Sequence, residues 1–82
     1  MAGTSRARYR RYLLQQRLPD TSLRERVFSA ATAAAPFSAD SLCQLLKLGG
    51  ITRPSVFRTL HEMVGAQVLV RPADQGGVYE LA

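Results

Sequence analysis

Apolar residues recur with the period of a helix between residues 52 and 64. They occupy positions i, i+4, i+7 and i+8 and are Val56, Leu60, Met63 and Val64. This spacing aligns them along one stripe and predicts a helix with one buried side. Thr52 is the expected N-cap, and Pro54 in the first turn costs no hydrogen bond because the first backbone N–H groups have no partner within the helix.

The opposite side of this expected helix is mainly polar. Arg58 lies almost opposite the apolar stripe, given about 100° of rotation per residue. Its expected neighbours on this outer side are Pro54, Ser55, His61 and Glu62. Phe57 lies at the boundary between the two sides, and several of these residue types contact bases in a DNA major groove. Two structural alternatives stay open: Arg58 pairs with Glu62 in solvent, or Phe57 belongs to the core.

Residues 6–18 are rich in helix formers and are followed by Pro19, so we expect a helix that ends there, preceded by a frayed terminus at residues 1–5. Its apolar side chains are Tyr9, Tyr12, Leu13 and Leu14. This is more apolar area than one small core is expected to absorb. We therefore expect this helix to provide the surface for a homodimer or for a protein partner.

Two more helices are expected between this segment and residue 52. Residues 22–34 open with the capping-box pattern Ser-x-x-Glu. In this pattern the Ser22 side chain accepts from the backbone N–H of Glu25, and the Glu25 side chain accepts from the backbone N–H of Ser22. The next helix has Ser38 as its N-cap and ends at the glycine pair 49–50. Two helices joined by a tight glycine-containing turn, the second with a polar outer side, are typical of a helix-turn-helix unit.

The period changes to two near the C-terminus. Residues 68–71 and 78–81 are two β-type runs, and the residues between them, 72–77, are typical of a turn. A hairpin after a helix-turn-helix predicts a winged helix: a mainly α fold with a small β-hairpin, about four helices and a two-stranded wing. We expect a basic N-terminal arm or helix at residues 1–18 and a winged-helix unit at residues 19–82, within a single domain of 82 residues.

The positive charge is concentrated in one part of the chain. Residues 1–17 carry five arginines and no acid, whereas residues 18–82 carry six basic and six acidic side chains, which accounts for the net charge of +5. The five arginines are Arg6, Arg8, Arg10, Arg11 and Arg17. Such a segment favours contact with the phosphate backbone or the minor groove. A solvated basic arm, or one that binds an acidic protein, is the alternative.

Several classes of function are disfavoured by composition. One cysteine, Cys43, and one histidine are too few for an internal disulfide or a four-ligand zinc site, so no metal or cofactor is expected. The sequence contains no arrangement of paired carboxylates, of Ser, His and Asp, or of Cys and His that would indicate an enzyme. Its apolar runs are short, without a signal peptide or membrane segment, and we expect a cytoplasmic protein.

The segment Thr-Arg-Pro-Ser-Val-Phe-Arg-Thr-Leu-His-Glu-Met-Val at residues 52–64 resembles the recognition helix of the ferric uptake regulator (Fur) family. That family's pattern is a small hydroxyl residue, Val, Tyr, Arg, a variable residue and Leu. Residues 68–71 and 76–81 resemble its wing, and residues 38–42 resemble the start of its third helix. The resemblance extends over roughly residues 20–82 and is most specific in the recognition helix.

The resemblance implies a transcription regulator whose recognition helix enters the major groove of A·T-rich operator DNA. By position, Ser55, Phe57 and Arg58 match the family's groove-facing residues, and Arg71 matches a basic residue that leads into the wing. Phe57 replaces the family's Tyr, which keeps apolar surface for a thymine methyl but loses a hydrogen bond. The family's second domain, with its metal sites and dimer interface, would begin after Ala82. If the 82 residues are the whole protein, metal sensing is expected to be absent; if they are part of a longer chain, sensing and dimerisation belong to the remainder.

Two functions are therefore expected from the sequence. The first is a repressor-type regulator that binds double-stranded DNA, with Ser55, Phe57 and Arg58 contacting bases. The expected backbone contacts are Arg6, Arg8, Arg10, Arg11, Thr52, Arg53 and Arg71. The second is a winged-helix protein-interaction module, such as an antagonist or adaptor of a transcription regulator, and the balanced charge of residues 18–82 favours it.

Overall fold

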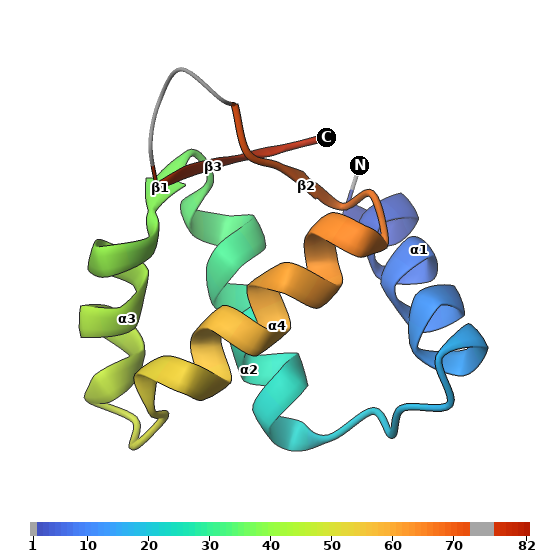
Figure 1. The fold of residues 1–82 in the computed structure, drawn as a ribbon, viewed down its shortest axis with the longest axis horizontal. Helices are drawn as coiled ribbons and strands as arrows, with labels where there is room; N and C mark the ends of the chain where they lie inside the picture. The colour runs from blue at the N-terminus through green and yellow to red at the C-terminus, as the bar shows by residue number, and fades with distance from the viewer. Residues whose placement is uncertain (1, 73–76) are drawn as a thin grey trace.

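The structure, a computed structural model, describes residues 2–72 and 77–82. Over these residues the chain forms four helices and a small antiparallel sheet (Figure 1). The elements are α1 (Ala2–Gln15), α2 (Ser22–Ala34), β1 (Phe37–Ser38), α3 (Ala39–Lys47), α4 (Arg53–Gly65), β2 (Leu69–Val70) and β3 (Val78–Leu81). The predicted fold class, mainly helical with a small sheet of winged-helix type, is confirmed. Most of the expected turn at residues 72–77 lies outside the described residues.

The sheet has one strand more than the sequence predicts. Its order is β1-β3-β2, and both pairs are antiparallel. In β1 Phe37 pairs with Tyr79, and their rings stack with centroids 5.5 Å apart. The sequence predicts no strand at residues 37–38, because a strand of two residues is too short to show alternation. The extra strand joins the segment before α3 to the C-terminal hairpin.

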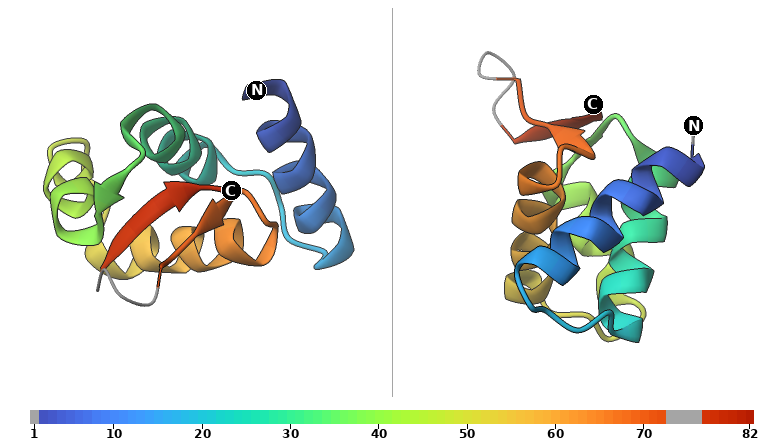
Figure 2. Two further views of the ribbon diagram at one scale, coloured as in Figure 1. Left: turned by 90° about the horizontal axis from the view of Figure 1, so that it is seen from above. Right: turned by 90° about the vertical axis from the view of Figure 1, so that its right-hand side faces the viewer.

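Helix α4 lies at the centre of the core, with the other helices packed against it (Figures 1 and 2). Val56, Leu60 and Met63 have no exposed surface, which confirms three members of the predicted stripe, and Val64 is partly buried against the same core. Removing such side chains from water is the main favourable contribution to folding, about 1.5–3 kcal/mol for each. The buried stripe therefore fixes which side of α4 faces inward.

Helix α1 belongs to this core. It spans Ala2–Gln15, whereas the sequence predicts a helix over residues 6–18. The helix therefore begins four residues earlier and ends three residues earlier than predicted, and residues 2–5 are helical rather than frayed. Tyr9 and Leu13 are buried, and the Tyr9 ring stacks on Phe28 with centroids 5.3 Å apart. Two of the four side chains expected to supply an apolar docking surface, Tyr9 and Leu13, are therefore unavailable for it, whereas Leu14 is 79% exposed and Tyr12 is half-buried.

The helix caps agree with the sequence at one position and differ at another. Ser38 is the N-cap of α3 as predicted, and its hydroxyl accepts a hydrogen bond from the Ser41 amide at 3.2 Å. The prediction of a capping box between Ser22 and Glu25 at the start of α2 is wrong. Thr21 is the N-cap instead, and its hydroxyl accepts a hydrogen bond from the Arg24 amide at 3.2 Å. The carboxylate of Glu25 instead accepts from Arg6 at 2.6 Å, so it contacts α1 rather than its own helix start.

A substitution in the stripe measures how much the fold depends on α4. Leu60→Ala should lower the free energy of unfolding by about 2–5 kcal/mol, because it removes apolar contacts and leaves a cavity. Leu14→Ala is the matched control, since the Leu14 side chain is 79% exposed, and should change stability by at most about 0.5 kcal/mol. Urea denaturation of both variants tests this, and equal losses would contradict the central place of α4.

Candidate nucleic-acid interface

The segment that leads into α4 contains a glycine in the left-handed conformation and a buried isoleucine. Gly50 has φ of +83°, a conformation that glycine adopts without strain, and Ile51 is buried. Thr52 occupies the N-cap position as predicted, but its hydroxyl donates to Ser55 Oγ at 3.0 Å instead of accepting from a backbone amide. The amides of this turn are therefore not capped by Thr52, and Thr52, Arg53 and Pro54 are exposed.

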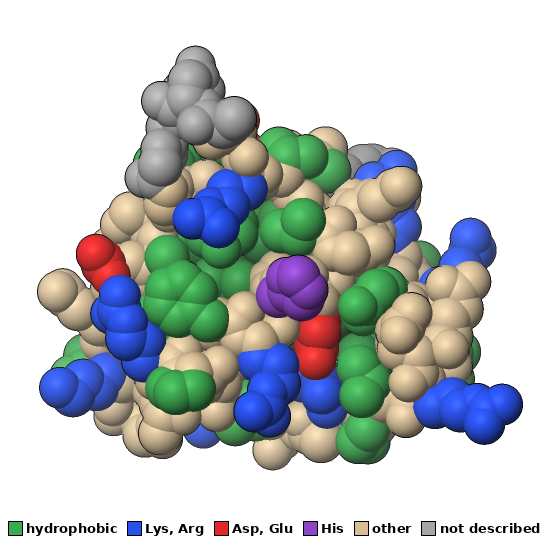
Figure 3. All heavy atoms as spheres, viewed as in Figure 1, with side chains coloured by type: hydrophobic (Ala, Val, Ile, Leu, Met, Phe, Trp, Pro, Cys, Tyr) green, Lys and Arg blue, Asp and Glu red, His purple; other side chains and the backbone are tan. Residues whose placement is uncertain are grey.

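The outer side of α4 carries the residues predicted to contact bases. Arg58 is exposed, Phe57 is 36% exposed and Ser55 is half-buried. Ser55 and Arg58 line one hollow with residues of α2, whereas Phe57 lines a second hollow together with His61 and Arg71 near the sheet. Figure 3 shows arginine and lysine side chains around apolar surface on this face. The three residues thus share a face but belong to two adjacent hollows.

Glu62 does not lie on this outer side, and the expectation that it does is wrong. It is only 5% exposed, because α1 and α2 cover the flank of α4 that it occupies. Its carboxylate accepts from the Tyr9 hydroxyl at 3.0 Å and from Arg24 Nε and Nη2, each at 3.0 Å. Arg58 is therefore not paired with Glu62 and points away from the core.

These three side chains form a buried polar cluster, which we call the Glu62 clamp (Glu62, Arg24 and Tyr9). It joins α1, α2 and α4 through charge-assisted hydrogen bonds, including a two-pronged contact from one guanidinium. Burial, and secondly the hydrogen bond to Glu62, raises the pKa of the Tyr9 hydroxyl well above its ordinary value. The hydrogen bond to Glu62 also raises the pKa of Arg24. Within residues 2–72 and 77–82, every buried side-chain nitrogen and oxygen has a hydrogen-bond partner.

Two arginines border the outer side of α4, and each lies over an aromatic ring. The Arg53 guanidinium forms an ion pair with Asp40 of α3 and lies 5.2 Å from the centroid of the Phe57 ring. The Arg71 guanidinium lies 5.6 Å from the centroid of the Tyr79 ring in β3. Both arginines are exposed and lie beside Phe57, so they present cations next to the outer side of α4.

The arginines of α1 do not lie on one side. Arg6 donates to Glu25, and its guanidinium lies 4.8 Å from the centroid of the Phe28 ring. Arg10 lines a hollow that also contains Asp20. The remaining pair, Arg8 and Arg11, lines a hollow at the end of α4. Folding therefore places the four arginines of α1 in two pairs with different surroundings, although the sequence concentrates them in one segment.

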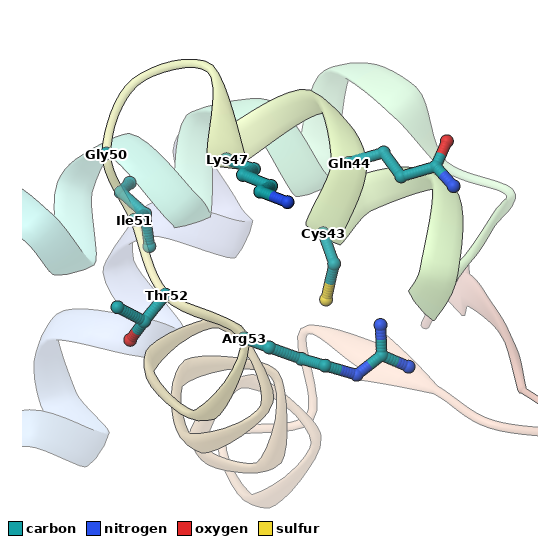
Figure 4. Close-up of a pocket in the computed structure, with 7 residues that line it drawn as sticks. All are labelled: Cys43, Gln44, Lys47, Gly50, Ile51, Thr52 and Arg53. Carbon is teal, nitrogen blue, oxygen red and sulfur yellow. The ribbon is translucent and has the colours of Figure 1, made fainter.

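A larger hollow, of about 420 Å³, lies between α3 and the start of α4 (Figure 4). Lys47 and Cys43 extend into it from α3, and Arg53 runs along its floor from α4. Burial raises the pKa of the Cys43 thiol, and the positive charge of Arg53 only partly offsets this effect. Sequence reasoning missed Lys47, although its position one turn after Cys43 indicates the same side of α3.

Comparisons with known proteins add no assignment: no family model matches the chain, and no curated protein matches it. In residues 2–72 and 77–82 no helix is long and apolar enough to cross a membrane. The same part of the chain contains no group of three or more His, Cys, Asp or Glu side chains placed to hold a metal ion. The site is therefore described by its geometry alone.

The Glu62 clamp predicts a pH dependence of stability. Since the pKa of Tyr9 is higher in the folded chain than its unfolded value near 10, its contribution is complete below pH 10 and is lost as the pH rises above it. Tyr9→Phe should lower stability at pH 7 by about 1.5–3 kcal/mol, because a hydrogen bond to a charged group is removed. The variant should also lose less stability than the wild type between roughly pH 10 and 11.

Urea denaturation at pH 7, 10 and 11 provides the measurement. Tyr12→Phe is the control, because Tyr12 lies on the same helix but its hydroxyl is outside the Glu62 clamp. An alkaline loss of stability that is the same in Tyr9→Phe and in the wild type would argue against this role of Tyr9.

Proposed function

We propose that the chain is a DNA-binding transcription regulator of the repressor type, similar to the winged-helix domain of the Fur family. In this proposal α4 enters the major groove, and β2 and β3 lie along the DNA backbone. The observation that carries it is the exposed face of α4, where Ser55, Phe57 and Arg58 are flanked by Arg53 and Arg71. A cytoplasmic location is part of the same proposal.

The chemistry of this face supports base contacts. A major groove about 12 Å wide admits one α-helix, and an arginine can donate two hydrogen bonds to guanine O6 and N7. Arg58 is exposed and outside the Glu62 clamp, so it is available for such a contact. Serine hydroxyls bond to several bases, and the apolar ring of Phe57 suits a thymine methyl group. Because Val56, Leu60 and Met63 on the other side of α4 are fully buried, these side chains are presented on a rigid support.

Contacts to phosphate would determine affinity rather than sequence preference. Thr52 and Arg53 lie at the N-terminus of α4, where uncapped amides favour an anion. Arg71 follows β2 and would reach the backbone beside the groove. The net charge of +5 favours association with a polyanion.

A protein-interaction module is the second candidate, and the ion pairs within the fold favour it. Arg24 is neutralised by Glu62, and Arg53 is paired with Asp40, so two of the six basic side chains of residues 18–82 are paired within the fold. A DNA-binding face is commonly more basic than this. Capture of a protein partner by the purified chain, together with no binding to any duplex at low salt, would support this candidate instead.

The proposed function predicts a steep dependence on salt. If about five phosphates are neutralised, the logarithm of the association constant should fall with the logarithm of salt concentration at a slope of roughly −4 to −5. Fluorescence anisotropy of a labelled duplex at several salt concentrations measures this slope. A flat titration would contradict a phosphate-dominated DNA complex.

Base recognition predicts a specific defect in one variant. Selection of bound duplexes from a random pool should give a preferred sequence for the wild type, and Arg58→Ala should relax that preference by about 1–3 kcal/mol at one base pair. Arg17→Ala removes the same charge from an exposed position at the end of α1 and serves as the control. If both variants keep the same preferred sequence, Arg58 does not contact a base.

A further inference from the structure

The hollow at the end of α4 lies where α1 packs beside that helix (Figure 1). Its volume is about 290 Å³. The residues that line it are Arg8, Arg11, Tyr12 and Gln15 from α1, Gly65 at the end of α4 and the two residues that follow it. The Arg8 guanidinium donates to the Gln67 carbonyl at 3.1 Å, which holds this side chain across the junction. We call this feature the α1–α4 hollow.

The side chains that line the α1–α4 hollow include hydrogen-bond donors and no acidic group. Two guanidiniums, a phenol and two amides are present, and none of the lining residues carries a carboxylate. The other arginine pair of α1 differs, because Arg6 is bonded to Glu25 and Arg10 shares its hollow with Asp20. A pair of guanidiniums beside other N–H and O–H donors suits an anion with several oxygens, such as a phosphate diester.

The hollow is also rigidly placed relative to α4. A Cβ atom at Gly65 would lie 3.0 Å from the ring of Tyr12, so glycine permits the close approach of α1 to the end of α4. Tyr9 and Leu13, one turn away on α1, are anchored in the core. The distance between the hollow and the outer side of α4 is therefore fixed by the fold.

The position of the α1–α4 hollow, at the last end of α4, matches one margin of a DNA major groove. Helix α4 has 13 residues and is about 20 Å long at 1.5 Å per residue, whereas the major groove is about 12 Å wide. A helix of this length reaches both margins of the groove, with Arg53 at its first end and the α1–α4 hollow at its last end. We propose that the α1–α4 hollow binds a backbone phosphate of the strand opposite the one that Arg53 contacts.

This inference rests on the proposed function, and it assigns the arginines of α1 unequal roles. Arg8 and Arg11 contact phosphate, whereas Arg6 is bonded to Glu25 of α2 and Arg10 lies in a hollow with Asp20. A pair of double variants with the same change in net charge separates the two roles. R8Q/R11Q alters the proposed contacts, and R6Q/R10Q is the matched control.

The experiment measures binding of a labelled duplex by the full chain as a function of salt, with thermal unfolding of each variant as a check on folding. R8Q/R11Q should weaken binding roughly tenfold to sixtyfold near about 0.1 M salt and make the salt slope shallower by about 1.8, since two contacts are lost. R6Q/R10Q should weaken binding by no more than about threefold and leave the slope unchanged.

The outcomes distinguish this inference from the proposed function. Equal losses in the two double variants, or a larger loss in R6Q/R10Q, would overturn the inference while duplex binding by the wild type keeps the proposed function. Absence of wild-type binding to any duplex would overturn both. Binding of polyglutamate but not of duplex, lost in R8Q/R11Q, would assign the hollow to an acidic protein and would also overturn the inference.

Discussion

The buried carboxylate of Glu62 is the constraint on which the placement of the helices depends. It accepts from α1 through Tyr9 and from α2 through Arg24, while the residue itself belongs to α4. Burial of an ion pair is costly, and an apolar replacement of similar size is often at least as stable. The consequence of this pair is therefore geometric: α4 cannot turn about its axis without separating the carboxylate from two donors on two other helices.

This constraint matters because an apolar stripe alone determines the rotation of a helix only loosely. Val56, Leu60 and Met63 would stay buried after a modest rotation of α4, but Glu62 would then lie in apolar surroundings without partners. The fixed rotation determines that Arg58 and Phe57 lie outward and that Thr59 is buried. The face proposed to contact bases is thus defined by contacts on the opposite flank of the same helix.

The packing of helices on the core also determines where the positive charges of residues 1–17 lie. By sequence, residues 1–17 carry all of the excess positive charge, which suggests one continuous basic arm. In the structure α1 packs on the core through one side, so its arginines project toward different neighbours, and Arg6 is paired with Glu25 of α2. Net charge along a segment therefore predicts attraction to a polyanion but not which cations remain free to contact it.

A feature could be predicted from the sequence when the residues that form it are close together along the chain. The stripe of α4, the Ser38 cap and the strand at residues 78–81 depend on neighbours a few residues away, and these predictions are confirmed. The strand predicted at residues 68–71 is shorter in the structure, where it spans Leu69–Val70. The position of Glu62 could not be predicted, because its partner Tyr9 is 53 residues away and only the folded chain brings them together. Strand β1 was missed for the same reason, since its two residues become a strand only by pairing with β3. Periodicity identifies the side of a helix that faces the core, whereas polar residues on its flanks are assigned only when the neighbouring elements are in place.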